Sequence, residues 1–205
     1  MTPRVALERG LAELALELPS AAPDRLLAYL ALLSKWNRTY NLTAIREPLA
    51  MVTHHVLDSL CVLPHLPLAQ DARLADAGSG AGLPGIALAI ARPRWRIALA
   101  ESSEKKAAFL RQAAIELRLD NVEVHEGRVE AWRPQPLFDL VISRAFAALA
   151  DFLDACRHLA APRGTLAAMT GAQPADTRTA CVVIKLKVPL LHAQRHLVLC
   201  PASSL

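Results

Sequence analysis

The sequence lacks the features that mark membrane and secreted proteins. Among its 205 residues, no uncharged apolar run is long enough to span a bilayer. The longest uncharged stretch, residues 77–91, is broken by four glycines and a proline. The first twenty residues contain three glutamates, which do not suit the apolar segment of a signal peptide. We therefore expect a soluble, cytoplasmic protein with no membrane partner.

Cysteine is scarce and scattered. The chain has Cys61, Cys156, Cys181 and Cys200, with no closely spaced pair. A zinc site normally uses close pairs of cysteine or histidine, and a disulfide framework is typical of a small secreted chain. We therefore predict four buried, reduced thiols and no bound metal.

Enough apolar residues are present to build a folded core. Hydrophobic residues make up 53% of the chain and charged residues 20%, which excludes an intrinsically disordered protein. Lysine and arginine number 23 against 19 aspartates and glutamates, which gives a formal charge of +4 at pH 7. This mild excess is compatible with a polyanionic partner but does not require one.

The spacing of apolar residues divides the chain into two parts. In the first part, apolar residues recur every three or four positions, which predicts helices over 5–18, 23–35 and 48–60. From about residue 73, short apolar runs alternate with amphipathic segments. The predicted strands cover 73–76, 95–100, 122–125, 138–143, 165–169, 181–188 and 196–199, and the predicted helices cover 83–91, 104–119 and 148–159. This alternation predicts an α/β fold with a doubly wound, mainly parallel sheet (71–205), on which an N-terminal helical extension (1–70) packs to form one compact unit.

A glycine-rich turn, residues 76–85, follows the first predicted strand. Its glycines let a ligand approach the backbone closely, and ligands of such sheets bind beyond the carboxyl ends of the strands. Asp76 ends this strand and Glu101 ends the next one. Asp76 could thus contact the methionine part of S-adenosylmethionine, and Glu101 its ribose hydroxyls. The alternative is that Asp76 caps a helix turn and Glu101 is a solvated loop charge.

The same turn is also compatible with a second cofactor. Gly80-x-Gly82-x-x-Gly85 matches the dinucleotide fingerprint, and with Glu101 it would suit an NAD-dependent oxidoreductase. That alternative leaves Asp76 unexplained, and no Tyr/Lys or His/Asp catalytic pair stands out in the sequence. The interpretation that this turn binds S-adenosylmethionine is therefore favoured.

A dense polar segment, residues 37–46, follows the second predicted helix. Its groups could contact base edges and phosphates of RNA, or the segment could be an ordinary loop that ends a helix. The side chains concerned are Asn37, Tyr40, Asn41, Thr43 and Arg46. In the third predicted helix, His54 and His55 point about 100° apart and cannot easily share a metal ion. We expect His55 to form a local hydrogen bond with Asp58 instead.

Six motifs occur in an order that resembles one protein family. They are Trp36-Asn37-Arg38-Thr39-Tyr40-Asn41-Leu42-Thr43-Ala44-Ile45-Arg46, His55-Val56-Leu57-Asp58-Ser59, the turn 76–85, Phe109-Leu110-Arg111-Gln112, Arg128-Val129-Glu130 and Ile142-Ser143-Arg144-Ala145-Phe146-Ala147. Each motif alone is weak, but six in register are highly specific. Over residues 36–199 the chain resembles the ribosomal RNA small subunit methyltransferase G family, also called the glucose-inhibited division protein B family.

The resemblance implies a bacterial enzyme with a Rossmann-like class I S-adenosylmethionine-dependent methyltransferase domain. Such an enzyme transfers a methyl group from S-adenosylmethionine to N7 of the guanosine at position 527 of 16S rRNA, in the small ribosomal subunit. Together with the strand-end acids, the expected cofactor contacts are Asp76, Gly78, Gly80, Leu83, Glu101, Val129, Glu130 and Arg144. Arg144, Asn37 and Asn41 are expected to position the substrate, and Tyr40, Thr43, Arg46 and Arg195 to contact RNA. For Arg195 the alternative is a surface position at a strand start, and the oligomeric state stays open, with a monomer favoured.

Three features depart from the family pattern. Glu101 stands where the family usually has aspartate, and Thr170 stands where a lysine is expected before Gly171. The segment 171–180 is also shorter than usual. Threonine in place of lysine removes a positive charge beside the expected RNA-binding site. This departure fits a further alternative, in which the chain is a non-catalytic, ribosome-associated protein that retains the methyltransferase fold.

Overall fold

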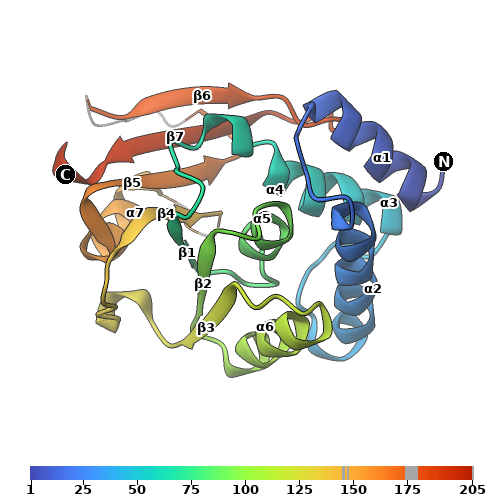
Figure 1. Cartoon of the computed structure of the whole chain (residues 1–205), viewed down its shortest axis with the longest axis horizontal. Helices are drawn as coiled ribbons and strands as arrows, with labels where there is room; N and C mark the ends of the chain where they lie inside the picture. Colours follow the sequence, from blue (N-terminus) through green and yellow to red (C-terminus); the bar gives the residue numbers. More distant parts are fainter. Residues whose placement is uncertain (145, 147, 174–179, 205) are drawn as a thin grey trace.

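A seven-stranded sheet forms the centre of the molecule, with the strand order β3-β2-β1-β4-β5-β7-β6 (Figure 1). The structure is a computed structural model that describes residues 1–144, 146, 148–173 and 180–204. The strands are β1 (Arg73–Ala77), β2 (Arg96–Glu101), β3 (Val122–Glu126), β4 (Phe138–Ser143), β5 (Ala160–Thr170), β6 (Val182–Leu186) and β7 (Arg195–Pro201). This sheet confirms the predicted α/β fold.

Five neighbouring strands run parallel, and the last two do not. β3, β2, β1, β4 and β5 pair in parallel, so their carboxyl ends meet at one edge of the sheet. β7 pairs antiparallel with β5 and β6, and Thr170 at the end of β5 lies opposite His196 near the start of β7. The first residue of β7, Arg195, therefore lies at the edge where the parallel strands end.

Helices cover both faces of this sheet. Those that connect the parallel strands are α5 (Gly85–Ala91), α6 (Glu104–Glu116) and α7 (Leu149–Cys156). The N-terminal segment contributes α1 (Pro3–Leu14), α2 (Ala22–Tyr40), α3 (Pro48–Met51), a π-helical segment (Val52–Leu57) and α4 (Asp58–Leu60). Short 3-10 turns occupy Leu63–His65, Val129–Ala131, Arg157–Leu159 and Ala202–Ser204.

Local chemistry sets the ends of the first two helices. Thr2 caps α1, because its hydroxyl oxygen accepts a hydrogen bond from the Val5 N–H over 3.3 Å. α1 ends before the predicted residue 18, since Ala15 takes a left-handed conformation with a φ of 50°. α2 continues past the predicted residue 35 and ends where Asn41 takes the same conformation. The polar segment 37–46 is thus partly helix and partly loop.

Alternate residues of β1 and β2 belong to two different cores. Leu74 and Leu99 pack in the larger core, which also holds residues of α1, α2, α5 and α6. Ala75 and Ala100 face the other way and pack in a smaller core with Phe152 of α7. Because side chains alternate along a strand, one strand serves both faces. The N-terminal helices therefore share the larger core with the sheet, and α2 contacts both α5 and α6 (Figure 1).

The prediction of four reduced thiols is wrong for two of the cysteines. Cys181 and Cys200 form a disulfide, with 4.3 Å between their Cα atoms. The register explains the pairing, because Val182 of β6 lies opposite Leu199 of β7, and the adjacent Cys181 therefore meets Cys200. Cys61 and Cys156 are buried free thiols, as predicted, and burial raises the pKa of each to about 12.

Within the described ranges, no helix is both long and apolar enough to cross a bilayer. α2 has 19 residues but carries charged side chains such as Arg25 and Lys35. In the same part of the chain, no group of three or more His, Cys, Asp or Glu side chains could hold a metal ion.

Candidate functional site

The glycine-rich turn after β1 lines a cavity of about 190 Å³ at the carboxyl edge of the sheet. The polar segment, the π-helical segment and the end of β4 complete its wall. The lining residues are Leu42, Thr43, His55, Gly78, Ser79, Gly80, Ala81, Leu83 and Arg144. The turn glycines, Leu83 and Arg144, expected to contact the cofactor, thus share one cavity with Thr43, which was expected to contact RNA.

Gly80 and Gly82, two of the turn glycines with left-handed backbones, have different surroundings. The φ angle is 59° at Gly80 and 90° at Gly82. A β-carbon at Gly82 would clash with the buried side chain of Ile86, whereas one at Gly80 would meet only the Gly78 carbonyl oxygen, at 3.9 Å. We expect Gly82→Ala to lower the free energy of unfolding by about 2–4 kcal/mol, through backbone strain and overpacking, and Gly80→Ala by about 1 kcal/mol through strain alone. Chemical denaturation would measure both, and equal losses would contradict the argument.

Asp76 lies beneath the turn. Its side chain is 0% exposed, and its Oδ2 accepts a hydrogen bond from the Gly85 N–H over 2.8 Å, at the start of α5. Within the described residues its buried Oδ1 has no hydrogen-bond partner. Burial raises the pKa of this carboxyl to about 7. Asp76 therefore caps α5 with one oxygen and leaves the other as an acceptor.

The raised pKa of Asp76 predicts how stability depends on pH. Between about pH 4 and pH 7 the folded chain keeps the Asp76 proton that the unfolded chain has lost, so the free energy of unfolding falls as the pH rises through this window. We expect Asp76→Asn to remove about 2–4 kcal/mol of this decline. Denaturation from pH 4 to pH 8 measures it, with Asp120→Asn, an exposed carboxylate, as the control. A curve for Asp76→Asn as steep as that of the wild type would refute the prediction.

Glu101 holds the turn from the neighbouring strand. Its Oε2 accepts a hydrogen bond from the Gly80 N–H and its Oε1 one from the Ser103 N–H, each over 2.8 Å. The side chain is buried. It is therefore no solvated loop charge. A carboxylate can accept more hydrogen bonds than these two, so Glu101 retains acceptor capacity at the strand end.

A second cavity, of about 350 Å³, adjoins the first. Its lining residues are Ile45, His54, His55, Asp58, Arg144, Met169, Thr170, Gly171 and Arg195. His55 and Arg144 line both cavities. The glycine-rich turn thus lies on one side of these two side chains, and a polar, cationic cavity lies on the other.

The predicted hydrogen bond between His55 and Asp58 is wrong. Both oxygens of Asp58 bind arginines, Oδ2 with Nη1 of Arg144 at 2.9 Å and Oδ1 with Nε of Arg195 at 2.8 Å. Such charge-assisted bonds outcompete a neutral imidazole. His55 Nε2 lies 3.0 Å from Oγ1 of Thr43 instead. Burial, with a contribution from Arg144, lowers the pKa of His55 to about 4, so its ring is neutral at pH 7.

Asp58 is the site residue whose role the sequence did not reveal. It is separated from Arg144 by 86 residues and from Arg195 by 137. No local spacing connects such positions. The only signal in the sequence is that Asp58 is the single acidic residue of the predicted helix 48–60.

The polar segment 37–46 folds back on itself. The Asn37 carboxamide is buried, donates to the Thr43 carbonyl oxygen over 3.0 Å and accepts from the Thr43 N–H over 2.9 Å. Asn41 Oδ1 accepts a hydrogen bond from Arg46 over 2.8 Å. Tyr40 is 44% exposed. Asn37 thus shapes the segment, while the side chains of Tyr40, Asn41 and Arg46 lie at the surface.

The remaining predicted residues lie around the two cavities. Val129 is buried in the smaller core, and Glu130 is exposed; neither lines the two cavities. Thr170 lines the second cavity, and its hydroxyl donates to the Ala172 carbonyl oxygen over 2.8 Å. Most of the short segment 171–180, namely 174–179, lies outside the described residues.

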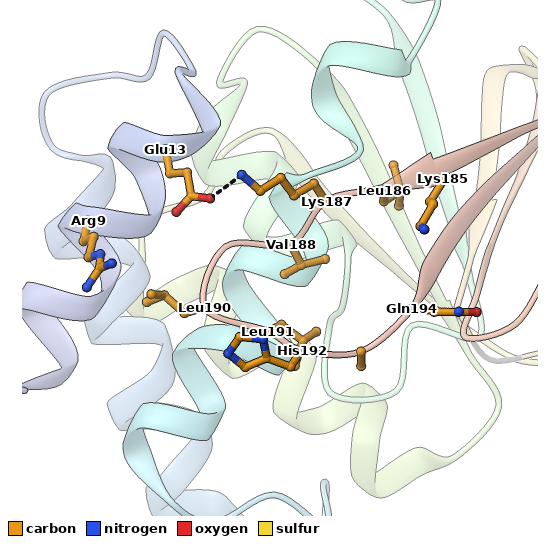
Figure 2. Close-up of a pocket in the computed structure, with 11 residues that line it drawn as sticks. Arg9, Glu13, Lys185, Leu186, Lys187, Val188, Leu190, Leu191, His192 and Gln194 are labelled. Carbon is orange, nitrogen blue, oxygen red and sulfur yellow. Dashed lines mark ion pairs between the residues drawn. The ribbon is translucent and has the colours of Figure 1, made fainter.

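A larger groove, of about 660 Å³, lies between α1 and the connection from β6 to β7 (Figure 2). Figure 2 shows Lys187 reaching toward Glu13, with 2.9 Å between Nζ and Oε1. Arg9 and His192 also line the groove. None of the residues predicted from sequence lines it, so size alone does not locate the candidate site.

Comparison with known sequences identifies the family. The family described as rRNA small subunit methyltransferase G matches residues 23–198. Ribosomal RNA small subunit methyltransferase G of Methylobacillus flagellatus is 51% identical over 201 residues, covering 96% of this chain and 97% of that protein. The protein of the same name from Nitrosospira multiformis is 50% identical, covering 97% of each. The chain belongs to the ribosomal RNA small subunit methyltransferase G family.

Solved structures of other proteins resemble the fold of this methyltransferase G family member. A SAM-dependent methyltransferase from Aquifex aeolicus aligns with a TM-score of 0.56 at 16% identity, covering 82% of this chain and 97% of that one. TrmN from Thermus thermophilus aligns with a TM-score of 0.54 at 19% identity, covering 80% and 53%. These likenesses confirm the Rossmann-like fold. Membership of the methyltransferase G family does not favour the NAD-dependent oxidoreductase alternative.

Proposed function

We propose that this protein transfers a methyl group from S-adenosylmethionine to N7 of the guanosine at position 527 of 16S rRNA, in the small ribosomal subunit. Membership of the family supports the reaction and the substrate. Within the chain, one observation carries the proposal: the cavity at the glycine-rich turn and the cationic cavity meet at His55 and Arg144. A methyl donor in the first would face a nucleotide in the second.

The residues at the turn fit S-adenosylmethionine. This molecule has two cationic groups and two ribose hydroxyls, which suit hydrogen-bond acceptors and negative charge. Glu101 keeps acceptor capacity, and Asp76 Oδ1 is a buried acceptor without a described donor. When bound, the cofactor supplies a methyl group made reactive by its sulfonium. The proposed contacts are Asp76, Gly78, Gly80, Leu83, Glu101 and Arg144, with Val129 and Glu130 flanking the adenine.

The proposed chemistry asks for alignment rather than proton transfer. Guanine N7 carries a lone pair and no proton at neutral pH, so no general base is needed. A neutral His55, bonded to Thr43, is consistent with this requirement. The residues of the site would hold N7 in line with the methyl carbon, which is catalysis by proximity and orientation. Arg144, which lines both cavities, is the proposed centre of that alignment.

The proposed RNA contacts lie around the cationic cavity and the polar segment. Arg195 and Arg46 would bind phosphate, and the exposed ring of Tyr40 would stack on a base. Asn41 and Thr43 would contact the nucleotide, and Asn37 would act through Thr43, to which it is bonded. Moving the guanine out of its base stack into the cavity would cost a few kcal/mol, which contacts to the edges of the base would offset. The proposed location is the cytoplasm, where the subunit is assembled.

Methyl transfer to ribosomal subunits tests this function. The protein is incubated with labelled S-adenosylmethionine and small subunits from bacteria that lack the modification, and the product is mapped by cleavage at 7-methylguanosine. We expect label at the guanosine at position 527, and none on subunits that already carry the modification. Label at another site would overturn the substrate. Cofactor binding without transfer would favour the non-catalytic alternative, and activity gained by Thr170→Lys would then trace the loss to Thr170.

A further inference from the structure

One buried carboxylate joins two arginines from distant parts of the chain. The Asp58 side chain, at the start of α4, is 3% exposed. Its Oδ2 binds Arg144, which follows β4, and its Oδ1 binds Arg195, which begins β7. Three elements thus meet at a single residue on the edge where the parallel strands end.

These bonds also fix how the guanidinium groups lie. Arg144 Nη1 donates to the His54 carbonyl oxygen over 3.0 Å as well as to Asp58, and Arg195 Nη1 donates to the Gln194 carbonyl oxygen over 2.9 Å. Each guanidinium has further N–H donors, and both arginines line the 350 Å³ cavity. Asp58 therefore limits the orientations in which these donors can meet a ligand.

The carboxylate also sets the charge of the cavity. Two guanidinium charges and one carboxylate charge leave a formal excess of one positive charge. Without Asp58 the excess would be two. During the proposed transfer, guanine N7 uses its lone pair to form the new N–C bond, the electron pair of the methyl–sulfur bond stays with sulfur, and the positive charge moves onto the guanine ring. Extra positive charge beside that ring would oppose the step.

We propose that Asp58 is a positioning residue for methyl transfer: it orients Arg144 and Arg195 toward the substrate nucleotide and limits the positive charge that the methylated guanine meets. This inference rests on the proposed function. It separates binding from reaction, because the positive charge of the arginines attracts RNA, whereas the orientation and charge balance that Asp58 imposes act on the transfer step. A residue needed only for folding would affect both together.

Asp58→Asn keeps the size of the side chain and removes its charge. We expect kcat for methyl transfer to fall about tenfold or more, while KM for the ribosomal subunit stays unchanged or falls, since the cavity gains net positive charge. Binding of S-adenosylmethionine should stay within about twofold of wild type. Lys187→Gln, which changes one charge in the separate groove of Figure 2, is the matched control and should leave kcat unchanged.

A double variant tests the charge directly. Asp58→Asn combined with Arg195→Gln restores the formal excess of one positive charge, and we expect it to recover several-fold of the kcat lost in Asp58→Asn. If Asp58→Asn does not fold, Arg195→Gln alone carries the test. That variant should raise KM and lower the salt dependence of RNA binding by about one counterion, with kcat at or above wild type.

Four results would overturn the proposal: an unchanged kcat in Asp58→Asn, a parallel loss of cofactor binding, a double variant no faster than the single one, or a fall in kcat in Arg195→Gln with KM unchanged. Transfer by the wild-type protein to guanine N7 is measured first and tests the proposed function itself. The ratios of variant to wild type then test Asp58, so the two failures are distinguishable.

Discussion

Replacing Arg144 with alanine should lower kcat/KM for methyl transfer to 16S rRNA about 10²-fold. Arg144 lines both cavities, and Asp58 and the His54 carbonyl oxygen hold its guanidinium in place. The variant removes a fixed donor at the point where methyl donor and nucleotide would meet. Misplacement of the reacting atoms by about 1 Å is enough for a loss of this size. Single-turnover kinetics with small subunits would measure it.

Folding should change much less than activity in Arg144→Ala. Asp58 keeps Arg195 as a partner, so its carboxylate is not left unpaired, and we expect about 1–3 kcal/mol less stability. Arg144→Lys keeps the charge but loses the fork-shaped donor set, so it should recover little activity. Lys187→Ala, at an exposed groove residue, is the control. Activity of Arg144→Ala within about threefold of wild type would show that the assigned role is wrong.

Replacing Glu101 with alanine should weaken S-adenosylmethionine binding about 10²-fold. The variant removes the proposed acceptor for the ribose hydroxyls and releases the Gly80 and Ser103 N–H groups that the carboxylate holds. Hydrogen bonds to a charged acceptor contribute about 1.5–3 kcal/mol each. Isothermal titration calorimetry would measure the change.

A second ligand separates the ribose contact from simple charge attraction. S-adenosylhomocysteine has the same ribose but no sulfonium, so Glu101→Ala should weaken both ligands by a similar factor. Glu101→Asp, which keeps the carboxylate on a shorter side chain, should keep affinity within about fivefold. A loss confined to S-adenosylmethionine would mean that Glu101 acts through its charge and not through the ribose.

Periodicity in the sequence predicted the elements that position the site. β4 matches the predicted strand 138–143, and β1 ends one residue past its prediction, so the glycine-rich turn follows it directly. The length of β5 was underestimated, since it begins at Ala160 rather than at 165. The prediction missed the first half of this strand because Pro162 and Gly164 are typical turn residues. In this first half Ala160 pairs with Phe138 of β4, and the register shifts before Thr165 pairs with Leu140.

The candidate site was predictable where its residues lie at the ends of neighbouring strands and unpredictable where it depends on how separate elements pack together. Asp76 and Glu101 end neighbouring strands, so the alternation of strands and helices was enough to bring them to one edge. His55 pairs with Thr43, and Asp58 with Arg195, because the N-terminal segment packs at the same edge where β7 begins. Helical spacing alone pointed to a His55–Asp58 pair, which does not form.

By itself, the sequence determined the order of strands and helices, the glycine-rich turn with its two strand-end acids, and membership of the methyltransferase G family. These are local properties, since apolar period and motif order depend on neighbouring residues. Only the tertiary structure decided that Asp58 holds Arg144 and Arg195, and that Cys181 meets Cys200. Such contacts depend on which strands become neighbours and in which direction they run. That choice is made by the packing of the whole chain, because burying both faces of the sheet at once couples segments that lie from 19 to 137 residues apart.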